Sequence, residues 1–397
     1  MKILQLCNKP PFPAVDGGCI AMKNISLGLL QNKVKLKIIS ISTEKHPFEI
    51  DKIPKNFVKK TNIEGVFIDT RVNIIDAFSA LVTSDSYNVS RFFSADFDRK
   101  LKETLLNNKY DFVHLESLFL TPYIGTISRY SKAKIVLRSH NLEHLIWERL
   151  ANLEGNKAKR IYLKHLSKKL KNYEHKVLND VHGIAAISFE DTKRYQSLNC
   201  EVPLITIPFG IDLENYVPQI KLPKEKLNLF HIGSMDWNPN IEAINWFLDD
   251  IFPELDSNKI ELHLAGKNMP DYIKNVNHKN VKIHGVVSYA LDFMSKYDVM
   301  IVPLLSGSGM RIKIIEGMAL GKTIITTKIG LEGIDATHKK NVLIADTTEE
   351  FKSLINWLIL NPNECLKIGE NARKFIEAHH DNKVIMKSLM SFYNSIS

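Results

Sequence analysis

Short apolar runs, many of them β-branched, alternate with longer segments of helical periodicity along almost the whole sequence. Strands that are buried on both faces of a parallel sheet read as such near-continuous apolar runs. The runs are 2–7, 34–41, 112–115, 135–137 and 184–187 in the first half, then 227–232, 260–265, 281–284, 299–304, 323–327 and 342–345 in the second. The alternation predicts an α/β fold with two doubly wound, Rossmann-like domains.

The length of 397 residues exceeds one ordinary domain and is sufficient for two, each able to bury its own core. Residues 202–223 contain four prolines without helical periodicity, so we expect them to connect the halves. The predicted domains are 1–205 and 206–381, and a final helix at about 382–397 is expected to pack back on the first. Ligands of open parallel sheets bind at the carboxyl ends of the strands, so the functional loops should line one shared cleft between the two sheets.

The composition indicates a folded globular chain of a reducing compartment. The 44% hydrophobic and 24% charged content is ordinary for a globular chain. The four cysteines have no CxxC spacing, which argues against a zinc ribbon or a disulfide framework. The N-terminal apolar run is too short for a signal peptide, and no stretch has the length to span a bilayer. We expect a cytoplasmic protein that contacts a membrane, if at all, at its inner surface.

The net charge of +9 favours anionic partners such as nucleotides or phospholipid headgroups. The densest basic run, 156–176, has eight Lys/Arg, one acid and an apolar stripe of helical spacing. Two interpretations stay open: a solvated face over a core-facing stripe, or peripheral contact with an anionic membrane. Nucleic acid is disfavoured because no aromatic stacking platform or recognition motif accompanies the charge.

The strongest candidate site is the segment 303–321, PLLSGSGMRIKIIEGMALG, between a buried strand and a helix. A Gly-Ser-Gly turn at a helix start leaves backbone N–H groups pointing outward, where the helix dipole adds positive charge. Arg311 and Lys313 add two full charges, and Glu316 follows one turn after the helix start. We expect a diphosphate at the turn and sugar hydroxyls at Glu316.

Ordered motifs along nearly the whole chain resemble the retaining glycosyltransferases of the GT-B fold, family four. The motifs are KPPFPAVDGG at 9–18, SYNVSRF at 86–92, VLRSHNLE at 136–143, AAISFED at 185–191, PFGID at 208–212, HIGSMDWNPNIEAINWFL at 231–248, AGK at 265–267, HGVV at 284–287 and SGSGMRIKIIEGMALGKTIITTKIGLEGI at 306–334. The resemblance implies a first domain that binds the acceptor and a second that binds a nucleotide-diphosphate sugar. It also implies retention of anomeric configuration without metal or cofactor.

Matched position by position, Glu316 falls on the family's ribose-binding glutamate. The sequence departs from the family's pattern in two places. Ser308 stands where the family often has a second glutamate near the donor sugar. Ser234 and the stretch at 239–240 stand where it often has an arginine and a lysine. Arg311 and Lys313 are the expected replacements, and Lys267 is the next candidate. The remaining candidates for donor binding are Gly233, Ser234, Gly309 and Met310.

In the first domain, Gly17 and Gly18 begin a helix after the first strand, where backbone N–H groups can approach a phosphate or an acceptor hydroxyl. By resemblance this loop lies beside the donor phosphates. His140 follows the strand at 135–137 and corresponds to the family's histidine that reaches the transferred sugar, so His140 and Glu316 are the candidate catalytic residues.

Two short motifs also match sites of other protein classes. HNLEH at 140–144 matches a zinc peptidase motif, but His140 follows a strand too closely to share a helix face with His144. Asp96 and Asp98 form a lone D-x-D, which helix capping explains.

A GT-B epimerase acting on the nucleotide sugar and a catalytically silent nucleotide-sugar-binding protein are the alternative functions. The favoured role is transfer to a glycan or lipid-linked acceptor in polysaccharide, glycolipid or glycoconjugate synthesis.

Overall fold

A computed structural model describes residues 1–70, 89, 91–219, 221–223, 225–307 and 309–397. The chain divides into two compact units, residues 1–208 with 385–397, and residues 209–384. The sequence predicts the domain boundaries after residues 205 and 381, and the structure has them after residues 208 and 384. Each unit is a parallel sheet covered by helices, so the predicted α/β fold with two doubly wound domains is confirmed.

Unit 1 is a seven-stranded parallel sheet in the order β3-β2-β1-β4-β5-β6-β7. Its central strand β1 pairs with β2 from Lys2 against Lys35 and with β4 from Ile3 against Phe112. The strands are β1 Lys2–Cys7, β2 Lys35–Ser42, β3 Glu64–Phe67, β4 Phe112–Glu116, β5 Lys134–Ser139, β6 Gly183–Ala186 and β7 Leu204–Thr206. The central strands are buried on both faces, which explains their uninterrupted apolar sequence.

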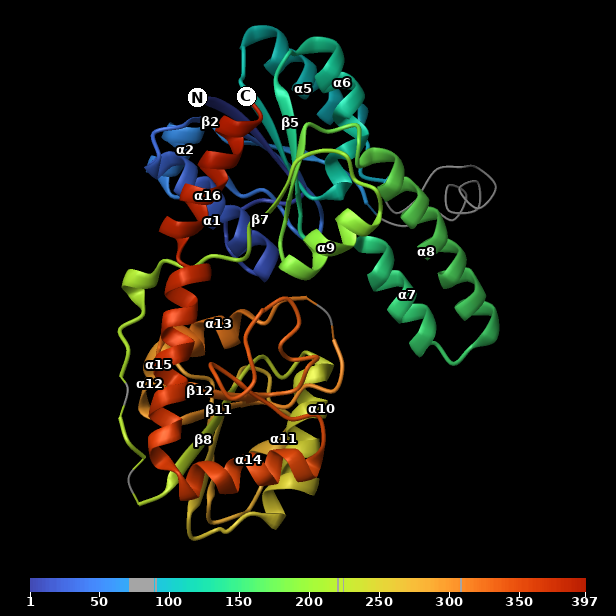
Figure 1. Cartoon of the computed structure of the whole chain (residues 1–397). Helices are drawn as coiled ribbons and strands as arrows, with labels where there is room; N and C mark the ends of the chain where they lie inside the picture. The colour runs from blue at the N-terminus through green and yellow to red at the C-terminus, as the bar shows by residue number, and fades with distance from the viewer. Residues whose placement is uncertain (71–88, 90, 220, 224, 308) are drawn as a thin grey trace. The chain divides into compact units, whose positions relative to one another are not determined.

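Helices cover both faces of this sheet, with α1 and α16 on one side and α5 and α6 on the other (Figure 1). The helices of unit 1 are α1 Gly17–Gln31, α2 Lys55–Thr61, α5 Ala95–Asn107, α6 Ile124–Tyr130, α7 Glu143–Leu153, α8 Lys157–Val177, α9 Phe189–Ser197 and α16 Asn382–Ser395. The last helix buries Ile385, Leu389 and Tyr393 in the same cluster as Ile3 and Met22. The C-terminal helix therefore completes the core of unit 1.

Unit 2 is a six-stranded parallel sheet in the order β10-β9-β8-β11-β12-β13. Its strands are β8 Leu227–Ile232, β9 Ile260–Ala265, β10 Val281–Gly285, β11 Val299–Val302, β12 Thr323–Thr326 and β13 Leu343–Ile344. Its helices are α10 Asn238–Trp246, α11 Asp271–Lys274, α12 Ala290–Lys296, α13 Ile312–Ala319, α14 Thr348–Leu360 and α15 Pro362–His379. Helix α14 starts at a capping box of Thr347 and Glu350, which satisfies the free backbone donors there.

The segment 202–223 differs from its prediction. Instead of being only a connection, it contains β7 (Leu204–Thr206), which pairs in parallel with β6 and forms the edge of the first sheet. The three residues of β7 lie between the prolines at 203 and 208. Because prolines indicate a turn or a connection, the sequence did not indicate a strand here. The strand β3 was also missed, because Gly65 interrupts a half-exposed edge strand.

Candidate active site

The loops after β8, β9 and β11 converge at the carboxyl edge of the second sheet. The backbone N–H of Gly266 donates to the carbonyl of Gly285 at 2.7 Å, and that of Gly233 donates to the carbonyl of Ala265 at 3.1 Å. A Cβ on Gly266 would lie 1.9 Å from the carbonyl oxygen of Gly233, so only glycine permits this approach. The strand ends thus form a close-packed backbone surface beside the predicted anion site.

The turn between β11 and α13 has the backbone conformation that its glycines predict. Gly307 and Gly309 have φ of +106° and +85°, in the left-handed region that favours glycine. A Cβ on Gly307 would also lie 2.9 Å from the Trp237 ring, so this turn packs against the loop that follows β8. Ser308 lies outside the described residues.

Arg311 is the N-cap residue of α13 and is buried, with its guanidinium 5.3 Å from the centroid of the Trp237 ring. Its Nη1 also donates to the carbonyl of Gly309. Stacking on Trp237 holds the planar group at the helix start, where the dipole and the free N–H groups of the first turn already favour an anion. Next to it, the side chain of Met310 lies 3.4 Å from the position of a Cβ on Gly333.

Lys313 extends from the first turn of α13 toward the end of β8. Its Nζ lies 2.9 Å from Oδ1 of Asn240, 3.3 Å from the carbonyl of Ile232 and 3.4 Å from Nε2 of His231. Nδ1 of His231 lies 2.9 Å from the carbonyl of Ile301, so the ring donates from Nδ1 and presents an Nε2 lone pair to Lys313. Burial first, and then the charge of Arg311, lower the pKa of Lys313 to about 7.

Asn240 belongs to the stretch 239–240, where the resemblance would place a lysine, and it links three parts of the site. Its Nδ2 donates to the carbonyl of Ser234 at 2.8 Å while its Oδ1 accepts from Lys313. A Cβ on Gly233 would lie 3.0 Å from the Lys313 ammonium. Lys313 therefore brings its charge to the Gly233 and Ser234 loop from the opposite side of the site, which is a physical basis for the predicted replacement.

The two other candidates in this region lie on its outer side. The hydroxyl of Ser234 donates to Asp236, which also accepts from Nδ2 of Asn268 at 2.9 Å. Lys267 is exposed, and its carbonyl accepts from the N–H of Met235 at 2.9 Å. The backbone of Lys267 thus supports the β8 loop. Hydrogen bonds from Ser234 and Asn268, and only then the charge of Lys267, lower the pKa of Asp236.

Glu316 lies one turn further along α13 and accepts a hydrogen bond from the hydroxyl of Tyr216 at 3.1 Å from Oε1. Arg373 of α15 fixes this tyrosine, because Nη1 donates to the carbonyls of Tyr216 at 2.7 Å and of Ala319 at 2.6 Å. Burial raises the pKa of Glu316, and the Tyr216 hydroxyl opposes that shift. With Oε1 in use by Tyr216, Oε2 retains its acceptor capacity for a ligand hydroxyl.

In unit 1, His140 belongs to a buried network centred on Glu116, the last residue of β4. Nε2 of His140 lies 2.7 Å from Oε2 of Glu116, whose side chain is fully buried. The same carboxylate contacts Arg138 at 3.2 Å, His114 at 3.2 Å and Gln5 at 2.8 Å. Arg138 and His114 hold the pKa of Glu116 well below its usual range against the effect of burial.

This network fixes the orientation and tautomer of His140. A carboxylate only accepts, so Nε2 of His140 carries a proton. Burial lowers the pKa of His140 in spite of Glu116, so the neutral ring retains an Nδ1 lone pair. Ser117, directly after Glu116, has φ of +110°, a strained conformation of the kind that clusters at functional sites. The sequence did not reveal Glu116, although a carboxylate at the end of a central strand is a usable signal.

The start of α1 confirms a helix at Gly17 and Gly18, with Asp16 as its N-cap. The carboxylate of Asp16 accepts from the N–H of Cys19 at 2.9 Å and binds Nζ of Lys9 at 2.7 Å. A Cβ on Gly18 would lie 2.8 Å from Nζ of Lys9, so glycine makes room for this ion pair. Lys9 and the first helical turn thus both bind the Asp16 carboxylate.

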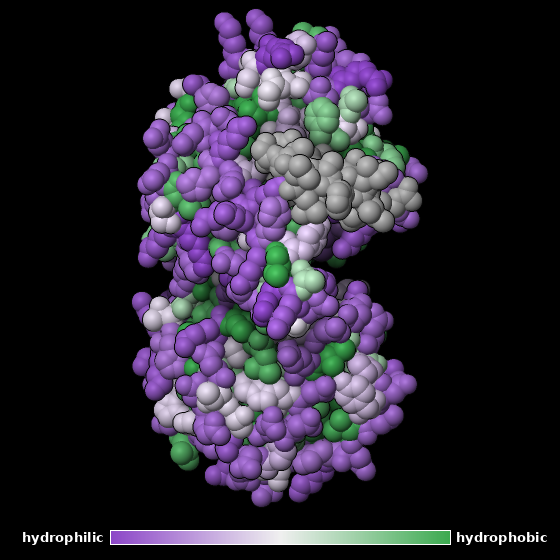
Figure 2. Space-filling model, turned by 90° about the vertical axis from the view of Figure 1, so that its right-hand side faces the viewer, coloured by the Kyte–Doolittle hydropathy of each residue, from purple (hydrophilic) through white to green (hydrophobic). Residues whose placement is uncertain are grey.

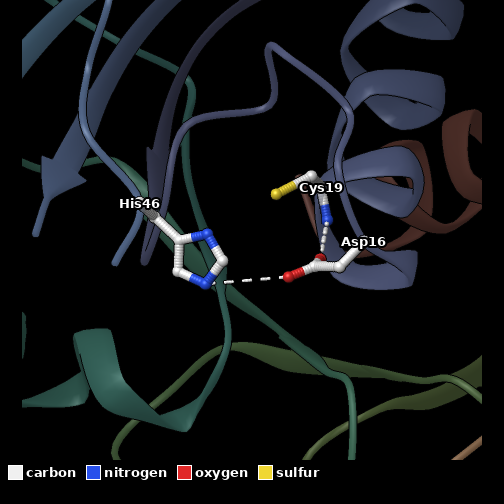
Figure 3. A group of neighbouring side chains, drawn as sticks. All are labelled: Asp16, Cys19 and His46. Atoms are coloured by element: carbon white, nitrogen blue, oxygen red, sulfur yellow. Dashed lines mark hydrogen bonds and ion pairs between the residues drawn. The ribbon is translucent and has the colours of Figure 1, made fainter. Parts of the chain in front are cut away.

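Asp16, Cys19 and His46 lie close enough together for a metal ion to be considered (Figure 3). The residues do not suit one. The Lys9 ammonium already contacts both oxygens of Asp16, at 2.8 and 2.7 Å. Burial raises the pKa of the Cys19 thiol to about 11, whereas a metal needs the thiolate. Capping and ion pairing explain the cluster.

The structure separates the two histidines of the HNLEH motif. His140 precedes α7, which begins at Glu143, and contacts Glu116. His144 is buried in α7, where its Nδ1 contacts the carboxylate of Glu174. Two histidines held by different carboxylates do not form the paired ligand face of a zinc peptidase. The D-x-D acids, Asp96 and Asp98, lie in the first turn of α5, where the helix dipole favours acidic side chains.

Comparisons with known proteins identify the class of fold. Sucrose-phosphate synthase from Thermosynechococcus elongatus aligns with a TM-score of 0.71 at 14% identity, over 100% of this chain and 99% of that chain. Anabaena HepE in complex with UDP aligns with a TM-score of 0.66 at 15% identity, over 100% of both chains. The two parallel-sheet units thus have the GT-B fold.

Sequence comparisons bear on the second unit and on the chain as a whole. Residues 226–361 match the family described as Glycosyl transferases group 1, a range that includes Lys313 and Glu316. An uncharacterized 44.6 kDa protein in the cps region of Klebsiella pneumoniae is 25% identical over 404 residues, which is 98% of each chain. The range that is similar to the group 1 family thus lies within unit 2.

Proposed function

We propose that this protein is a glycosyltransferase that moves a sugar from a nucleotide-diphosphate donor to an acceptor, with retention of anomeric configuration. The observation that carries the proposal is the start of α13. Arg311, Lys313 and a positive-φ glycine turn gather there, one turn from the half-buried carboxylate of Glu316, inside the range that matches the group 1 family. Diphosphate and ribose are the ligand groups that this combination suits.

In this proposal the diphosphate lies at Gly309, Met310 and Arg311, and the ribose hydroxyls bond to Glu316. Gly233, Ser234 and Lys267 border the same ligand from the β8 and β9 loops. HepE, which shares the fold, has been solved with UDP-glucose as well as UDP, and this supports a nucleotide sugar as donor. We propose from its position in the sequence that Ser308 also contributes to donor binding.

Retention requires the acceptor to attack on the same face that the diphosphate leaves. We propose that the leaving phosphate accepts the acceptor's proton, while cationic groups and helix N-termini stabilise the developing charge without a metal. Neutral His140, fixed through Nε2 by Glu116, presents Nδ1 as an acceptor to a hydroxyl of the transferred sugar. Gly17 and Gly18 offer backbone N–H groups to the donor phosphates or to the acceptor.

The acceptor is proposed to be a glycan or a lipid-linked glycan. The Klebsiella relative, which is described as lying in a cps region, supports a role in polysaccharide or glycoconjugate synthesis. The proposed location is cytoplasmic, at the inner face of a membrane. Unit 1 is the proposed acceptor-binding domain and unit 2 the donor-binding domain.

A thermal-shift screen of UDP, GDP, ADP and dTDP sugars tests the donor. A ligand that binds only the native state stabilises it by about 2.7 kcal/mol at a hundredfold excess over its dissociation constant. Slow hydrolysis of the selected donor, followed by NMR of the released anomer with and without chelator, tests the chemistry. A stabilising ligand that is never turned over would favour a silent binding protein, and conversion of the donor to an epimer would favour an epimerase.

A further inference from the structure

Helices α7 and α8 form a hairpin that projects from unit 1 (Figure 1) and is fixed at its base. The buried carboxylate of Glu174 accepts from the N–H groups of Glu143 at 2.8 Å and His144 at 3.3 Å. The hydroxyl of Ser167 donates to the carbonyl of His144 at 2.9 Å. The buried residues of α8 all lie from position 166 onward, so the first third of the helix takes no part in the core.

The far end of this hairpin, residues 150–164, is called the hairpin tip. It leaves four large hydrophobic side chains exposed: Leu150 at 48%, Leu153 at 81%, Ile161 at 69% and Tyr162 at 38%. Helix α7 ends at Leu153 and α8 begins at Lys157, so all four lie within about 8 Å of the connecting loop along the helix axes. Such a concentration at a projecting end is typical of an interaction surface.

Basic side chains surround these hydrophobic residues. Lys157, Arg160 and Lys164 are exposed on the first turns of α8. Glu154 forms an ion pair with Lys159 at 2.6 Å, which leaves the tip with net positive charge. Figure 2 views the molecule from the side of the hairpin and shows hydrophobic residues set among hydrophilic ones on that face.

The combination of exposed apolar and basic side chains fits an anionic lipid bilayer better than it fits a nucleic acid or a second copy of the chain. A bilayer with anionic headgroups offers an apolar layer behind a layer of negative charge, so apolar and basic side chains are both satisfied at different depths. A nucleic acid would pair the cations but leave Leu153 and Ile161 in water. A second copy of the chain would bring two positively charged tips together. Among the described residues, no helix is long and apolar enough to cross a membrane.

We infer that the hairpin tip docks this protein on an anionic lipid bilayer. Leu153 and Ile161 insert at the level of the headgroups, and Lys157, Arg160 and Lys164 bind lipid phosphates. Helix α7 has 11 residues and is therefore about 16 Å long, and it connects the tip to the segment that contains His140. The inference does not depend on the proposed enzyme activity, since lipid binding is measured without any sugar donor.

Vesicle co-sedimentation of the full-length protein tests the inference. The wild type should bind phosphatidylglycerol vesicles and not phosphatidylcholine vesicles, and 0.5 M salt should weaken the binding. The triple variant Lys157→Gln, Arg160→Gln, Lys164→Gln should bind about a hundredfold more weakly. The double variant Leu153→Ser, Ile161→Ser should bind at least about tenfold more weakly.

Matched controls lie on the exposed surface of unit 2. Leu360 is 73% exposed, so Leu360→Ser removes a comparable side chain away from the tip. Lys259→Gln, Lys279→Gln and Lys282→Gln together remove the same charge from exposed positions. Both controls should bind vesicles like the wild type, and all variants should keep the wild-type melting temperature.

Four results would overturn the inference, and three of them come from the vesicle and sedimentation experiments. They are a wild type that does not prefer anionic vesicles, tip variants that bind as well as the controls, and a wild-type dimer in sedimentation that both tip variants convert to monomer. The last would assign the tip to a second copy of the chain. Retention on immobilised DNA or RNA that only the charge variant loses would assign it to nucleic acid.

Discussion

The pKa of Lys313, lowered to about 7, makes nucleotide binding depend on pH in a way that can be calculated. Burial first, and then the charge of Arg311, weaken proton binding to Lys313 in the free site, in spite of the three protein acceptors around its ammonium. A bound diphosphate places negative charge beside it and restores its pKa toward the ordinary value of about 10.5. Binding therefore takes up a proton, about half of one at pH 7 and about one at pH 8.5.

The dissociation constant for the nucleoside diphosphate should then rise about sixteenfold from pH 7 to pH 8.5, a change of about 1.6 kcal/mol. Lys313→Met should bind weakly at both values and lose this dependence. The exposed control Lys374→Met should behave like the wild type. Titration calorimetry in two buffers of different ionisation enthalpy measures the affinity and the proton uptake together.

In the free protein, the free energy of unfolding rises with pH, whereas the affinity for the nucleoside diphosphate falls. The folded-state pKa of Lys313 lies below the unfolded value, so the unfolded chain binds more protons between about pH 7 and 10.5 and stability rises with pH in that window. Lys313→Met removes this penalty and should not lower the melting temperature at pH 7. Wild-type affinity that stays constant from pH 7 to 8.5, or a variant that retains the full dependence, would refute the reasoning.

Three other substitutions have distinct expected effects. Arg311→Ala should lower kcat/KM about ten- to a hundredfold with the melting temperature kept, because a charge-assisted hydrogen bond contributes roughly 1.5 to 3 kcal/mol; unchanged kinetics would mean that the charge comes from elsewhere. Tyr216→Phe should weaken donor binding severalfold and raise the pKa of Glu316, visible as an upward shift of the acidic limb of the pH profile; an unmoved limb would deny Tyr216 its positioning role. Glu116→Gln should destabilise unit 1 by about 3 to 5 kcal/mol in chemical unfolding, because it leaves a buried arginine without its carboxylate; a change below about 1 kcal/mol would contradict the network.

Much of the fold could be predicted because buried parallel strands have a strong sequence signal. The runs at 2–7, 227–232 and 260–265 match β1, β8 and β9 residue for residue. Edge strands have a weaker signal, since one side faces solvent and the chain can include glycine or neighbouring prolines, and so β3 and β7 were missed.

The candidate site was predictable where its residues lie within one loop and one helical turn. Arg311, Lys313 and Glu316 share one segment and could be found together. Their partners could not, because Tyr216 lies 100 residues from Glu316 in the chain and Asn240 lies 73 residues from Lys313. Contacts at such separations arise from the order of strands in the sheet, which no local pattern encodes.

The central claim is that Glu316 binds the ribose of a nucleoside diphosphate at the start of α13. Calorimetry of the selected nucleoside diphosphate and its 2′-deoxy form, with wild type, Glu316→Gln and the exposed control Glu370→Gln, tests it directly. The wild type and the control should prefer the ribose form. Glu316→Gln should bind it about ten- to a hundredfold more weakly and lose most of the preference, as expected for a hydrogen bond to a charged group. Equal affinities for the wild type and Glu316→Gln would contradict the assignment of the donor site.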